Sequence, residues 1–439
     1  MTNHKKSMFV LADGTNVGVT FLLASSLFLL WGFCNGMIDV MDKHFQTELN
    51  LSLSQSAWVQ FAHYLGYFLM ALPAGWLATK LGYKGGIITG LLMVAVGGFW
   101  FIPATQIGAF WAFLLGVSII AAGLTFLETI ANPYTTVLGD PRYAATRINL
   151  AQSCNGIGWV FGPVAGAAFF YGKDASGAST GSQTLWIPYA VVGVVVLILA
   201  VVFYFANVPD IKAKDDYQLD ASTPNDSPSI WAHPHFYIAV VAQFLYVAAQ
   251  AGIFSFFINY MTTQVPPLPE AWTAGAFKDW FHAEPGGAFL LSDKGAANLA
   301  SLGFLFFLAG RFSGAGILKK YSANKVLALY GTTNVLLCLL VFCKLGWLSV
   351  VCVFLSYFFM SIMFPTIFAL GIHGLGVRAK QASSFIVMAI MGGAVLPKLM
   401  GHVGDVYGMS RAFIVPMGCF AFVALYGYLW PTLSKSKAK

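Results

Sequence analysis

The chain has 439 residues, of which 58% are hydrophobic and 9% are charged, and its net charge is +7 at pH 7. A soluble domain carries about 25% charged residues, so this composition excludes a soluble enzyme. It also excludes intrinsic disorder, which requires low hydrophobicity. The mean hydropathy of +0.72 indicates a protein that crosses a membrane many times. The basic residues form no stripe and no zinc-finger spacing, so the charge does not predict nucleic-acid binding.

Twelve segments are apolar and long enough to cross a bilayer, which takes about 20 residues in a helix. Their expected limits are 19–46, 52–79, 85–104, 107–137, 144–171, 185–207, 233–263, 293–318, 324–343, 346–375, 381–405 and 411–431. The apolar runs are continuous rather than alternating, so they do not describe a β-barrel. We therefore predict an all-α membrane protein with twelve transmembrane helices.

The orientation follows from the basic residues between these segments. With the N-terminus in the cytoplasm, sixteen of the 24 Lys and Arg residues fall in cytoplasmic segments and six in external ones. Cytoplasmic loops of membrane proteins are enriched in Lys and Arg. We therefore expect both termini in the cytoplasm, and we interpret the positive net charge as a mark of topology.

The longest polar stretch between apolar segments is 208–230, which contains Asp, Lys, Ser and three Pro residues. This composition is typical of a linker, and it follows the sixth apolar segment. We predict an N-terminal six-helix bundle over 1–207, a cytoplasmic linker over 208–230 and a C-terminal six-helix bundle over 231–439. Many secondary transporters consist of two such halves, with the substrate held between them.

The external loop expected at 264–292 is rich in Pro and aromatic residues. We expect a partly ordered cap there, with a short amphipathic helix around 271–281. The favoured interpretation is a plain loop, and a gating role is the alternative.

Each half combines small and basic residues around its second apolar segment. Small residues let helices approach closely in a membrane, and basic residues mark the cytoplasmic edge. Arg311 lies a few residues from the cytoplasmic end of its segment, where packing or gating is expected rather than ligand binding. The predicted gating or structural residues are Gly75, Lys80, Lys84, Gly310 and Arg311.

The sequence contains no motif for breaking covalent bonds. A Walker loop and an H-E-x-x-H pair are both missing from it, and its G-x-S-x-G match at 177–181 lies in a polar loop between two apolar segments, not in the strand–turn–helix context of a nucleophile elbow. We therefore expect no enzyme activity and no cofactor. We also expect no metal site, apart from a transported sodium ion near Asp39 or Glu128.

Two acidic residues lie well inside apolar segments of the first half, Asp39 in the first and Glu128 in the fourth. A charge at the bilayer centre costs roughly 2.5–3.5 kcal/mol on insertion scales, so each acid needs a reason. Burial favours the neutral form of a carboxyl group, and such a group can exchange a proton between two access states. The alternatives are an acid paired for structural reasons and a carboxylate that binds sodium together with amide and hydroxyl oxygens.

Amide side chains accompany these acids at helical spacings. Residues three or four positions apart share a helix face, and four apolar segments carry such a face. Amides and carboxylates can bind several hydroxyl groups, and aromatic rings can pack on a pyranose, so we predict a site for an uncharged sugar or polyol. The alternative is hydrogen bonding between helices. The predicted substrate-binding residues are Asn35, Asp39, Glu128, Asn132, Gln152, Asn155, Gln243, Tyr246 and Gln250.

Several of these residues stand in longer motifs that fall in seven different apolar segments. The motifs are Asn35…Asp39, Leu127-Glu128-Thr129-Ile130-Ala131-Asn132-Pro133, Asn149-Leu150-Ala151-Gln152…Asn155, Ala242-Gln243…Tyr246…Gln250, Gly310-Arg311-Phe312, Met360-Ser361-Ile362…Pro365 and Ser383-Ser384-Phe385-Ile386-Val387-Met388. Together they resemble the bacterial fucose permease branch, which is the fucose–galactose–glucose symporter family of the major facilitator superfamily. The resemblance extends from about Phe21 to Val423.

This resemblance implies twelve helices in two pseudo-symmetric bundles and sugar–cation symport by alternating access. It implies that Asp39 and Glu128 take part in cation coupling and sugar binding, and that Gln152 and Asn155 contact the sugar. The sequence departs from fucose permease at Gly36 and Ile38, where that branch carries asparagines. Asp42 and Lys43 add a charged pair that is expected just outside the membrane. The identity of the sugar therefore stays open.

We expect a secondary active transporter that moves a neutral monosaccharide, a hexose or a deoxyhexose, inward with a cation. A proton is favoured as this cation, and sodium is the alternative. Less favoured are a drug exporter of the same superfamily, which would need a larger apolar cavity with fewer amides, and a membrane sensor with a transporter fold. The expected partners are the sugar and the lipid bilayer, and we expect a monomer in a bacterial inner membrane.

Overall fold

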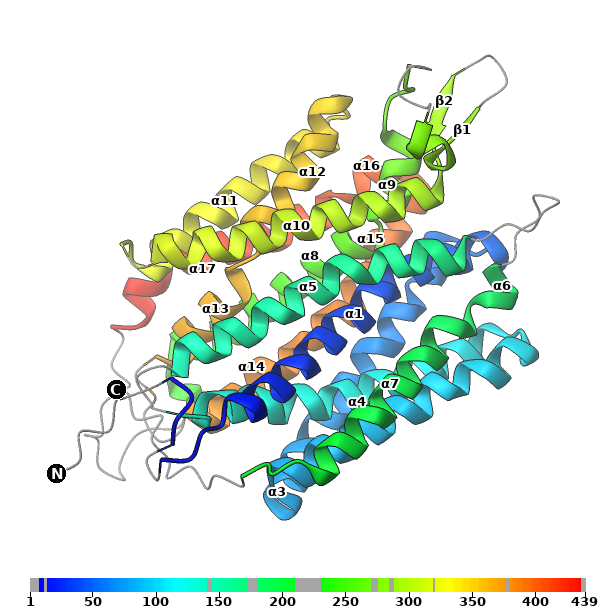
Figure 1. The fold of residues 1–439 in the computed structure, drawn as a ribbon. Helices are drawn as coiled ribbons and strands as arrows, with labels where there is room; N and C mark the ends of the chain where they lie inside the picture. Colours follow the sequence, from blue (N-terminus) through cyan, green and yellow to red (C-terminus); the bar gives the residue numbers. More distant parts are fainter. Residues whose placement is uncertain are drawn as a thin grey trace. The chain divides into compact units, whose positions relative to one another are not determined.

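The computed structural model describes residues 8–11, 14–139, 144–171, 181–209, 230–269, 275–283, 288–318, 320–373, 375 and 379–435. Helices dominate these residues (Figure 1). Contacts divide the chain into two compact units, of which unit 1 comprises Met1–Met37 and Leu65–Asp216 and unit 2 comprises Ile38–Tyr64 and Tyr217–Lys439. The predicted linker at 208–230 and the bundle boundaries beside it stay predictions, because residues 210–229 lie outside the described chain.

Unit 1 is built from long helices joined by short connections. Its helices are α1 (Gly18–Glu48), α3 (Trp58–Ile107), α4 (Phe110–Val137), α5 (Ala144–Phe170), α6 (Gly181–Thr184) and α7 (Trp186–Phe205). Helices α1 and α3 each cross the boundary between the units, so the end of α1 and the start of α3 belong to unit 2. We call this segment, residues 38–64, the 38–64 hairpin.

Helix α3 is interrupted at Gly82, whose φ of 69° and ψ of −178° are not helical. A positive φ suits glycine because this residue has no Cβ atom to clash with the backbone. The interruption separates the two segments that were expected at 52–79 and 85–104. Helix α3 therefore contains two of the predicted spans, one on each side of Gly82.

Four glycines bring α1 and α5 into close contact, and we call them the glycine seam: Gly32, Gly36, Gly158 and Gly162. A Cβ atom added to Gly32 would collide with the carbonyl oxygen of Asn155, and one added to Gly162 would lie 2.7 Å from the Cα atom of Gly36. The pairs are spaced four residues apart on both helices, so they line one face of each. Small residues at such spacing let membrane helices approach closely, and here they set the position of the polar residues on α1 and α5.

Unit 2 contains the 38–64 hairpin and the helices of the second half. Helix α8 lies at its centre, because α13, α15 and α17 all contact it. The elements are α2 (Leu53–Ser56), η2 (Ile230–Ala232), α8 (Pro234–Ser255), α9 (Phe257–Gln264), η4 (Gly275–Trp280), β1 (Phe281–Ala283), β2 (Phe289–Leu291), α10 (Asp293–Leu318), α11 (Ala323–Phe342), α12 (Trp347–Met360), α13 (Met363–Ile372), α14 (Ala379–Met388), η6 (Ala389–Met391), α15 (Gly392–Tyr407), α16 (Met409–Ala412) and α17 (Ile414–Leu433).

Several predicted spans of the second half are interrupted helices. The segment expected at 233–263 breaks at Phe256, and the segment expected at 346–375 breaks at Ser361 and Ile362. The last carbonyl groups of a helix have no partner within that helix. Each interruption therefore leaves backbone oxygens that side chains of neighbouring helices can reach.

The loop expected at 264–292 is partly ordered, but its structure differs from the prediction. Instead of an amphipathic helix around 271–281, it contains the short 3₁₀ helix η4 and the antiparallel strands β1 and β2, in which Phe281 pairs with Leu291. The chain leaves helical geometry at Phe281 because the following residues form backbone hydrogen bonds with β2. Residues 271–274 of the expected helix lie outside the described chain.

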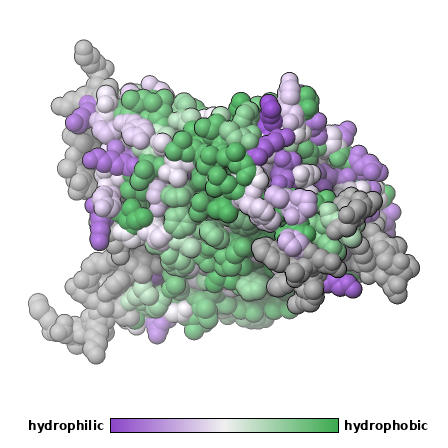
Figure 2. Space-filling model, turned by 90° about the horizontal axis from the view of Figure 1, so that it is seen from above, coloured by the Kyte–Doolittle hydropathy of each residue, from purple (hydrophilic) through white to green (hydrophobic). Residues whose placement is uncertain are grey.

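Ten helices of the described chain are long and apolar enough to cross a membrane. The two further expected spans, 52–79 and 144–171, correspond to the first part of α3 and to α5, which are also helical. Figure 2 shows a broad band of hydrophobic side chains, with hydrophilic side chains at two opposite ends of the band. A large apolar surface is a liability in water, so this band fits contact with lipid, and the structure is consistent with twelve spans.

Candidate functional site

In unit 1, Glu128 lies in a narrow and otherwise apolar pocket. The pocket is lined by residues of α1 and α4, namely Leu27, Phe28, Trp31, Leu127, Glu128 and Ala131. The rings of Phe28 and Trp31 are one helical turn apart, with centroids separated by 6.2 Å. A carboxyl group beside aromatic rings can accept hydrogen bonds from hydroxyl groups while the rings contact an apolar ring face. Glu128 forms no ion pair with a described residue.

The predicted amides of α4 and α5 lie together in this unit. The Asn132 amide nitrogen donates to the backbone carbonyl oxygen of Glu128 over 3.0 Å, and the Asn132 amide oxygen accepts from Gln152 over 3.0 Å. Asn155 donates to the carbonyl oxygen of Phe28 over 3.3 Å. The structure therefore brings Glu128, Asn132, Gln152 and Asn155 together, through hydrogen bonds that join α4 to α5 and α5 to α1.

Asn35 lies on α1 between the two glycines of the seam and is 8% exposed. Its amide oxygen has no hydrogen-bond partner in the described chain. Buried polar atoms of native proteins are nearly always paired, so an unpaired one calls for an explanation. A polar ligand would supply the missing partner.

The indole of Trp31 is held by a bond that the sequence did not indicate. Its Nε1 atom donates to the hydroxyl oxygen of Tyr67 on α3 over 2.6 Å. The bond fixes the orientation of the indole that lines the Glu128 pocket. The spacing of Trp31 and Asn35, four residues apart on α1, was the available signal for the ring, but nothing in the sequence identified Tyr67.

In unit 2, Asp39 is buried with one satisfied oxygen and one unsatisfied oxygen. Its Oδ1 atom accepts from the amide nitrogen of Gln60 over 2.8 Å, and its Oδ2 atom has no partner among the described residues. The hydroxyl group of Ser255, at the end of α8, lies near the same carboxyl group and interacts with it. Sequence reasoning did not identify Gln60 or Ser255.

The predicted residues of α8 have different surroundings. Tyr246 donates to the carbonyl oxygen of Met360 over 2.8 Å, at the point where α12 ends and the helix is interrupted. Gln243 is fully buried, and neither atom of its amide group has a partner in the described chain. Gln250 is half-buried on the same helix. Tyr246 is therefore held by backbone, whereas Gln243 retains its hydrogen-bonding capacity.

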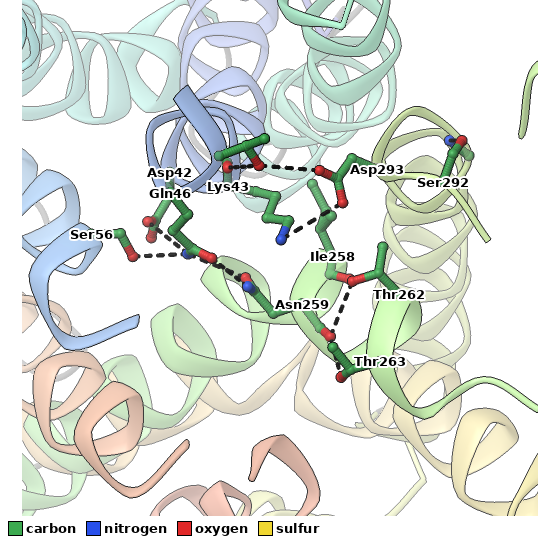
Figure 3. A network of polar contacts seen from close by, with 12 residues as sticks. Asp42, Lys43, Gln46, Ser56, Ile258, Asn259, Thr262, Thr263, Ser292 and Asp293 are labelled. Atoms are coloured by element: carbon green, nitrogen blue, oxygen red, sulfur yellow. Dashed lines mark hydrogen bonds and ion pairs between the residues drawn. The ribbon is translucent and has the colours of Figure 1, made fainter. Parts of the chain in front are cut away.

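A polar network in unit 2 surrounds Asp42 (Figure 3). The Gln46 amide nitrogen donates to Asp42 over 3.4 Å and to Ser56 over 2.8 Å, and Gln46 and Asn259 exchange hydrogen bonds. Asp42 is 0% exposed, so its carboxyl group is buried within the protein, and the expectation that it lies just outside the membrane stays a prediction. Gln46, which donates to it, is itself bonded to Ser56 of α2 and Asn259 of α9.

Lys43 points to a different partner from that of Asp42. Its ammonium nitrogen lies 3.7 Å from Asp293 of α10, whose other oxygen accepts from Thr47 over 3.3 Å (Figure 3). The two neighbours in the sequence therefore differ in their surroundings, because Asp42 is buried and Lys43 forms a partly exposed ion pair with Asp293.

The predicted gating and structural residues make contacts within their own units. Lys80 lies 4.0 Å from the ring of Trp76, and Lys84 donates to the carbonyl oxygen of Ala206 over 2.9 Å. Gly75 lies in α3. In unit 2, a Cβ atom on Gly310 would lie 2.5 Å from the hydroxyl of Ser361, and the guanidinium of Arg311 lies 4.8 Å from the ring of Phe307.

Two basic residues have roles that sequence reasoning missed. Arg147, expected only as a marker of the cytoplasmic edge, is 0% exposed and donates to the carbonyl oxygens of Thr135 and Met8, each over 3.0 Å. Lys398 lies 3.8 Å from the ring of Trp58. Every residue has a backbone carbonyl group, so the sequence could not show which of these groups accept hydrogen bonds from Arg147.

Comparison with known proteins gives relatives over nearly the whole chain. A glucose/galactose transporter of Brucella abortus is 31% identical over 94% of each chain. An L-fucose–proton symporter of Escherichia coli is 35% identical over 93% of this chain and 92% of that one. These relatives are transporters and not enzymes.

Solved structures agree with this relationship. A crystal structure of the Escherichia coli fucose–proton symporter in the outward conformation has a TM-score of 0.66 and 33% identity, and it covers 94% of this chain and 99% of that chain. A bacterial homologue of the lysosomal transporter Spinster, at 12% identity and a TM-score of 0.69, shares the fold. The Major Facilitator Superfamily matches residues 19–436. The chain therefore belongs to the Major Facilitator Superfamily.

Proposed function

We propose that the chain is a secondary active transporter that moves a neutral monosaccharide, a hexose or a deoxyhexose, together with a cation by alternating access. The observation that carries this proposal is in unit 1, where Glu128 lines a narrow cleft together with Phe28 and Trp31. Carboxylates and amides bind sugar hydroxyl groups, and the rings offer an apolar surface to the sugar ring. The glucose/galactose transporter and the fucose–proton symporter named above support the same substrate class.

The substrate contacts proposed in unit 1 are Glu128, Asn132, Gln152, Asn155 and Asn35. Those proposed in unit 2 are Gln243, Tyr246 and Gln250, with Asp39. The unpaired amide atoms of Asn35 and Gln243 support this assignment, because a bound sugar would satisfy them. Buried amides with free hydrogen-bonding capacity disfavour the alternative of a drug exporter.

Asp39 and Glu128 are the proposed coupling acids. Neither forms an ion pair with a residue that the structure describes, so a negative charge on either would be uncompensated. A buried charge without a partner is costly, and a transported cation would neutralise it. We favour a proton, as in the named fucose–proton symporter, and sodium is the alternative.

The proposed setting is a bacterial inner membrane, with both termini in the cytoplasm and the chain acting as a monomer. No resident cofactor is needed, because the cation gradient drives transport. Sugar and cation must each bind one access state better than the other, since equal affinity for both states would shift no population.

Uptake by purified protein in liposomes tests this function. A panel of labelled hexoses and deoxyhexoses is offered under an inwardly directed proton gradient, under an inwardly directed sodium gradient and without a gradient. We expect accumulation of at least one sugar under the proton gradient, and its collapse when a protonophore is added. Uptake of a sugar that neither gradient accelerates would leave a uniporter, and uptake of no sugar would overturn the proposed function.

A further inference from the structure

Two acids of α1 lie one helical turn apart in unit 2. Asp39 and Asp42 share a helix face, where residues three positions apart have Cβ atoms about 5–6 Å apart. Both are buried, and in each carboxyl group the Oδ1 atom accepts from a neutral amide, Gln60 for Asp39 and Gln46 for Asp42. The Oδ2 atom of each has no partner in the described part of the chain. The two carboxyl groups are close enough to repel each other when both are charged.

Two buried hydroxyl groups face Asp39 from other helices. Ser255 of α8 and Tyr357 of α12 are both 0–1% exposed, and neither hydroxyl has a hydrogen-bond partner among the described residues. Both hydroxyl groups lie close enough to the Asp39 carboxyl group to interact with it electrostatically. The Tyr357 ring is stacked on Phe254, with centroids 4.7 Å apart, so its position is fixed. The Asp39 carboxyl group thus has two unpaired hydroxyl oxygens near it, one from α8 and one from α12.

Neither acid forms an ion pair with a residue in the described part of the chain. Lys43 on α1 interacts electrostatically with Asp42, and Tyr357 on α12 with Asp39. The ammonium group of Lys43 is directed to Asp293. The side chains that α3 and α9 contribute, Gln60 and Asn259, are neutral amides. Two carboxylates buried side by side without a paired cation are strongly disfavoured, so a bound cation would relieve the repulsion between them.

We propose that Asp39 and Asp42 form one binding site for the transported monovalent cation, with Ser255 and Tyr357 completing it. The inference rests on the proposed function and deepens it, because it adds Asp42 as a second required acid. Oxygen ligands of this kind suit hard cations. The shared chemistry is neutralisation of a carboxylate pair, either by a proton held between the two groups or by a sodium ion held by oxygens of these four residues.

The decisive variant is Asp42→Asn, which removes the charge but keeps an oxygen that can accept from Gln46. In liposomes, we expect this variant to lose gradient-driven accumulation of the sugar while it retains exchange of labelled for unlabelled sugar. A residue that only held Gln46 in place would not separate these two activities. Asp293→Asn is the matched control, because it removes a nearby acid that is already paired with Lys43, and it should accumulate sugar as the unaltered protein does.

Two further measurements identify the cation and guard against misfolding. If the site holds sodium, sodium should raise the melting temperature of the unaltered protein relative to choline, and it should not do so for Asp42→Asn. If the site holds a proton, sodium should have no effect on the melting temperature, and sugar uptake should follow the pH gradient. If Asp42→Asn does not fold, Ser255→Ala decides. A higher half-saturating cation concentration for uptake in Ser255→Ala supports the site, and an unchanged one overturns it.

The outcomes separate this inference from the proposed function. If the unaltered protein accumulates no sugar, the proposed function fails. In a second outcome, the unaltered protein and Asp42→Asn both accumulate sugar normally, whereas Asp39→Asn accumulates none. Coupling then depends on Asp39 and not on Asp42, and only the two-acid site is overturned.

Discussion

Glu128 in unit 1 and Asp39 in unit 2 are both buried acids on long helices, but their neighbours differ in kind. Glu128 faces aromatic rings, and the amides near it are already bonded to one another and to backbone. Asp39 faces hydroxyl groups that have no partner in the described chain, and a second acid lies one turn away. The first environment suits an organic molecule with a ring and hydroxyl groups, and the second suits a small cation. On the proposed function, we therefore expect Glu128 to contribute mainly to sugar binding and Asp39 mainly to cation binding.

The largest expected effects come from neutralising each acid in turn. Asp39→Asn and Glu128→Gln should both abolish sugar accumulation, but for different reasons. Asp39→Asn should keep sugar exchange, whereas Glu128→Gln should weaken sugar binding by about tenfold to hundredfold, the usual contribution of hydrogen bonds to a charged group. Equilibrium binding of labelled sugar and exchange in liposomes measure the two effects. Equal loss of sugar affinity in both variants would contradict the division between the acids.

The second effect tests how the unit 1 site is positioned. Gly158→Leu places a side chain against the backbone of α1, where a Cβ atom would already lie 2.5 Å from the Phe33 nitrogen. We expect a destabilisation of about 3 kcal/mol, at the upper end of overpacking effects, with a lower melting temperature in detergent. Gly418→Ala on α17 is the control, because nothing lies within 4 Å of its added Cβ atom. An unchanged melting temperature for Gly158→Leu would mean that the seam does not hold α1 to α5.

A smaller effect is expected from the aromatic wall of the pocket. Trp31→Ala should raise the half-saturating sugar concentration about tenfold, since an aromatic contact contributes about 0.5–1.5 kcal/mol beyond its buried area. The cation dependence of uptake should stay unchanged. Trp31→Phe keeps a ring but loses the hydrogen bond to Tyr67, so its half-saturating sugar concentration should lie between those of the unaltered protein and Trp31→Ala. A shift in cation dependence would place Trp31 with Asp39 rather than with Glu128.

The smallest effect is expected at the partly exposed ion pair of Lys43 and Asp293. Asp293→Asn removes it, and an exposed ion pair contributes about 0.2–1 kcal/mol. We expect a small fall in melting temperature that 1 M salt reduces, because salt screens such pairs. A fall as large as that of Gly158→Leu would show that this pair, rather than buried contacts, holds the 38–64 hairpin in unit 2.

Helix positions could be predicted from the sequence because hydrophobicity is continuous along each span. The polar face of α4 could be predicted because the spacing of residues fixes which of them share a helix face. Glu128 and Asn132 are bonded through the backbone of one helix, as their spacing of four allows. Gln152 joins them from α5. The glycine seam was visible as two pairs spaced by four, although nothing in the sequence said that the pairs face each other.

The remaining features depend on contacts between distant segments. Asp42 and Lys43 were expected as a charged pair, and nothing in the sequence indicated that the Asp42 carboxyl group is buried and bonded to Gln46. Arg147 looked like a topology marker, and its partners are carbonyl groups that every residue possesses. The interruption after Met360 was hidden within an apolar run, and with it the partner of Tyr246. Burial and backbone pairing of this kind cannot be derived from composition or periodicity.

The 38–64 hairpin has a consequence for how the gene could be divided. It is encoded in the first half, but its contacts lie in the second half: Asp405 accepts from the backbone nitrogens of Leu53 and Ser54 over 2.8 and 2.9 Å, and Gln46 pairs with Asn259. Suppose that the coding sequence were cut within 208–230 and that the two pieces were produced together. The first polypeptide would then carry the 38–64 hairpin, a segment that binds the second polypeptide. The halves would thus possess an affinity for each other that no added fusion partner needs to supply.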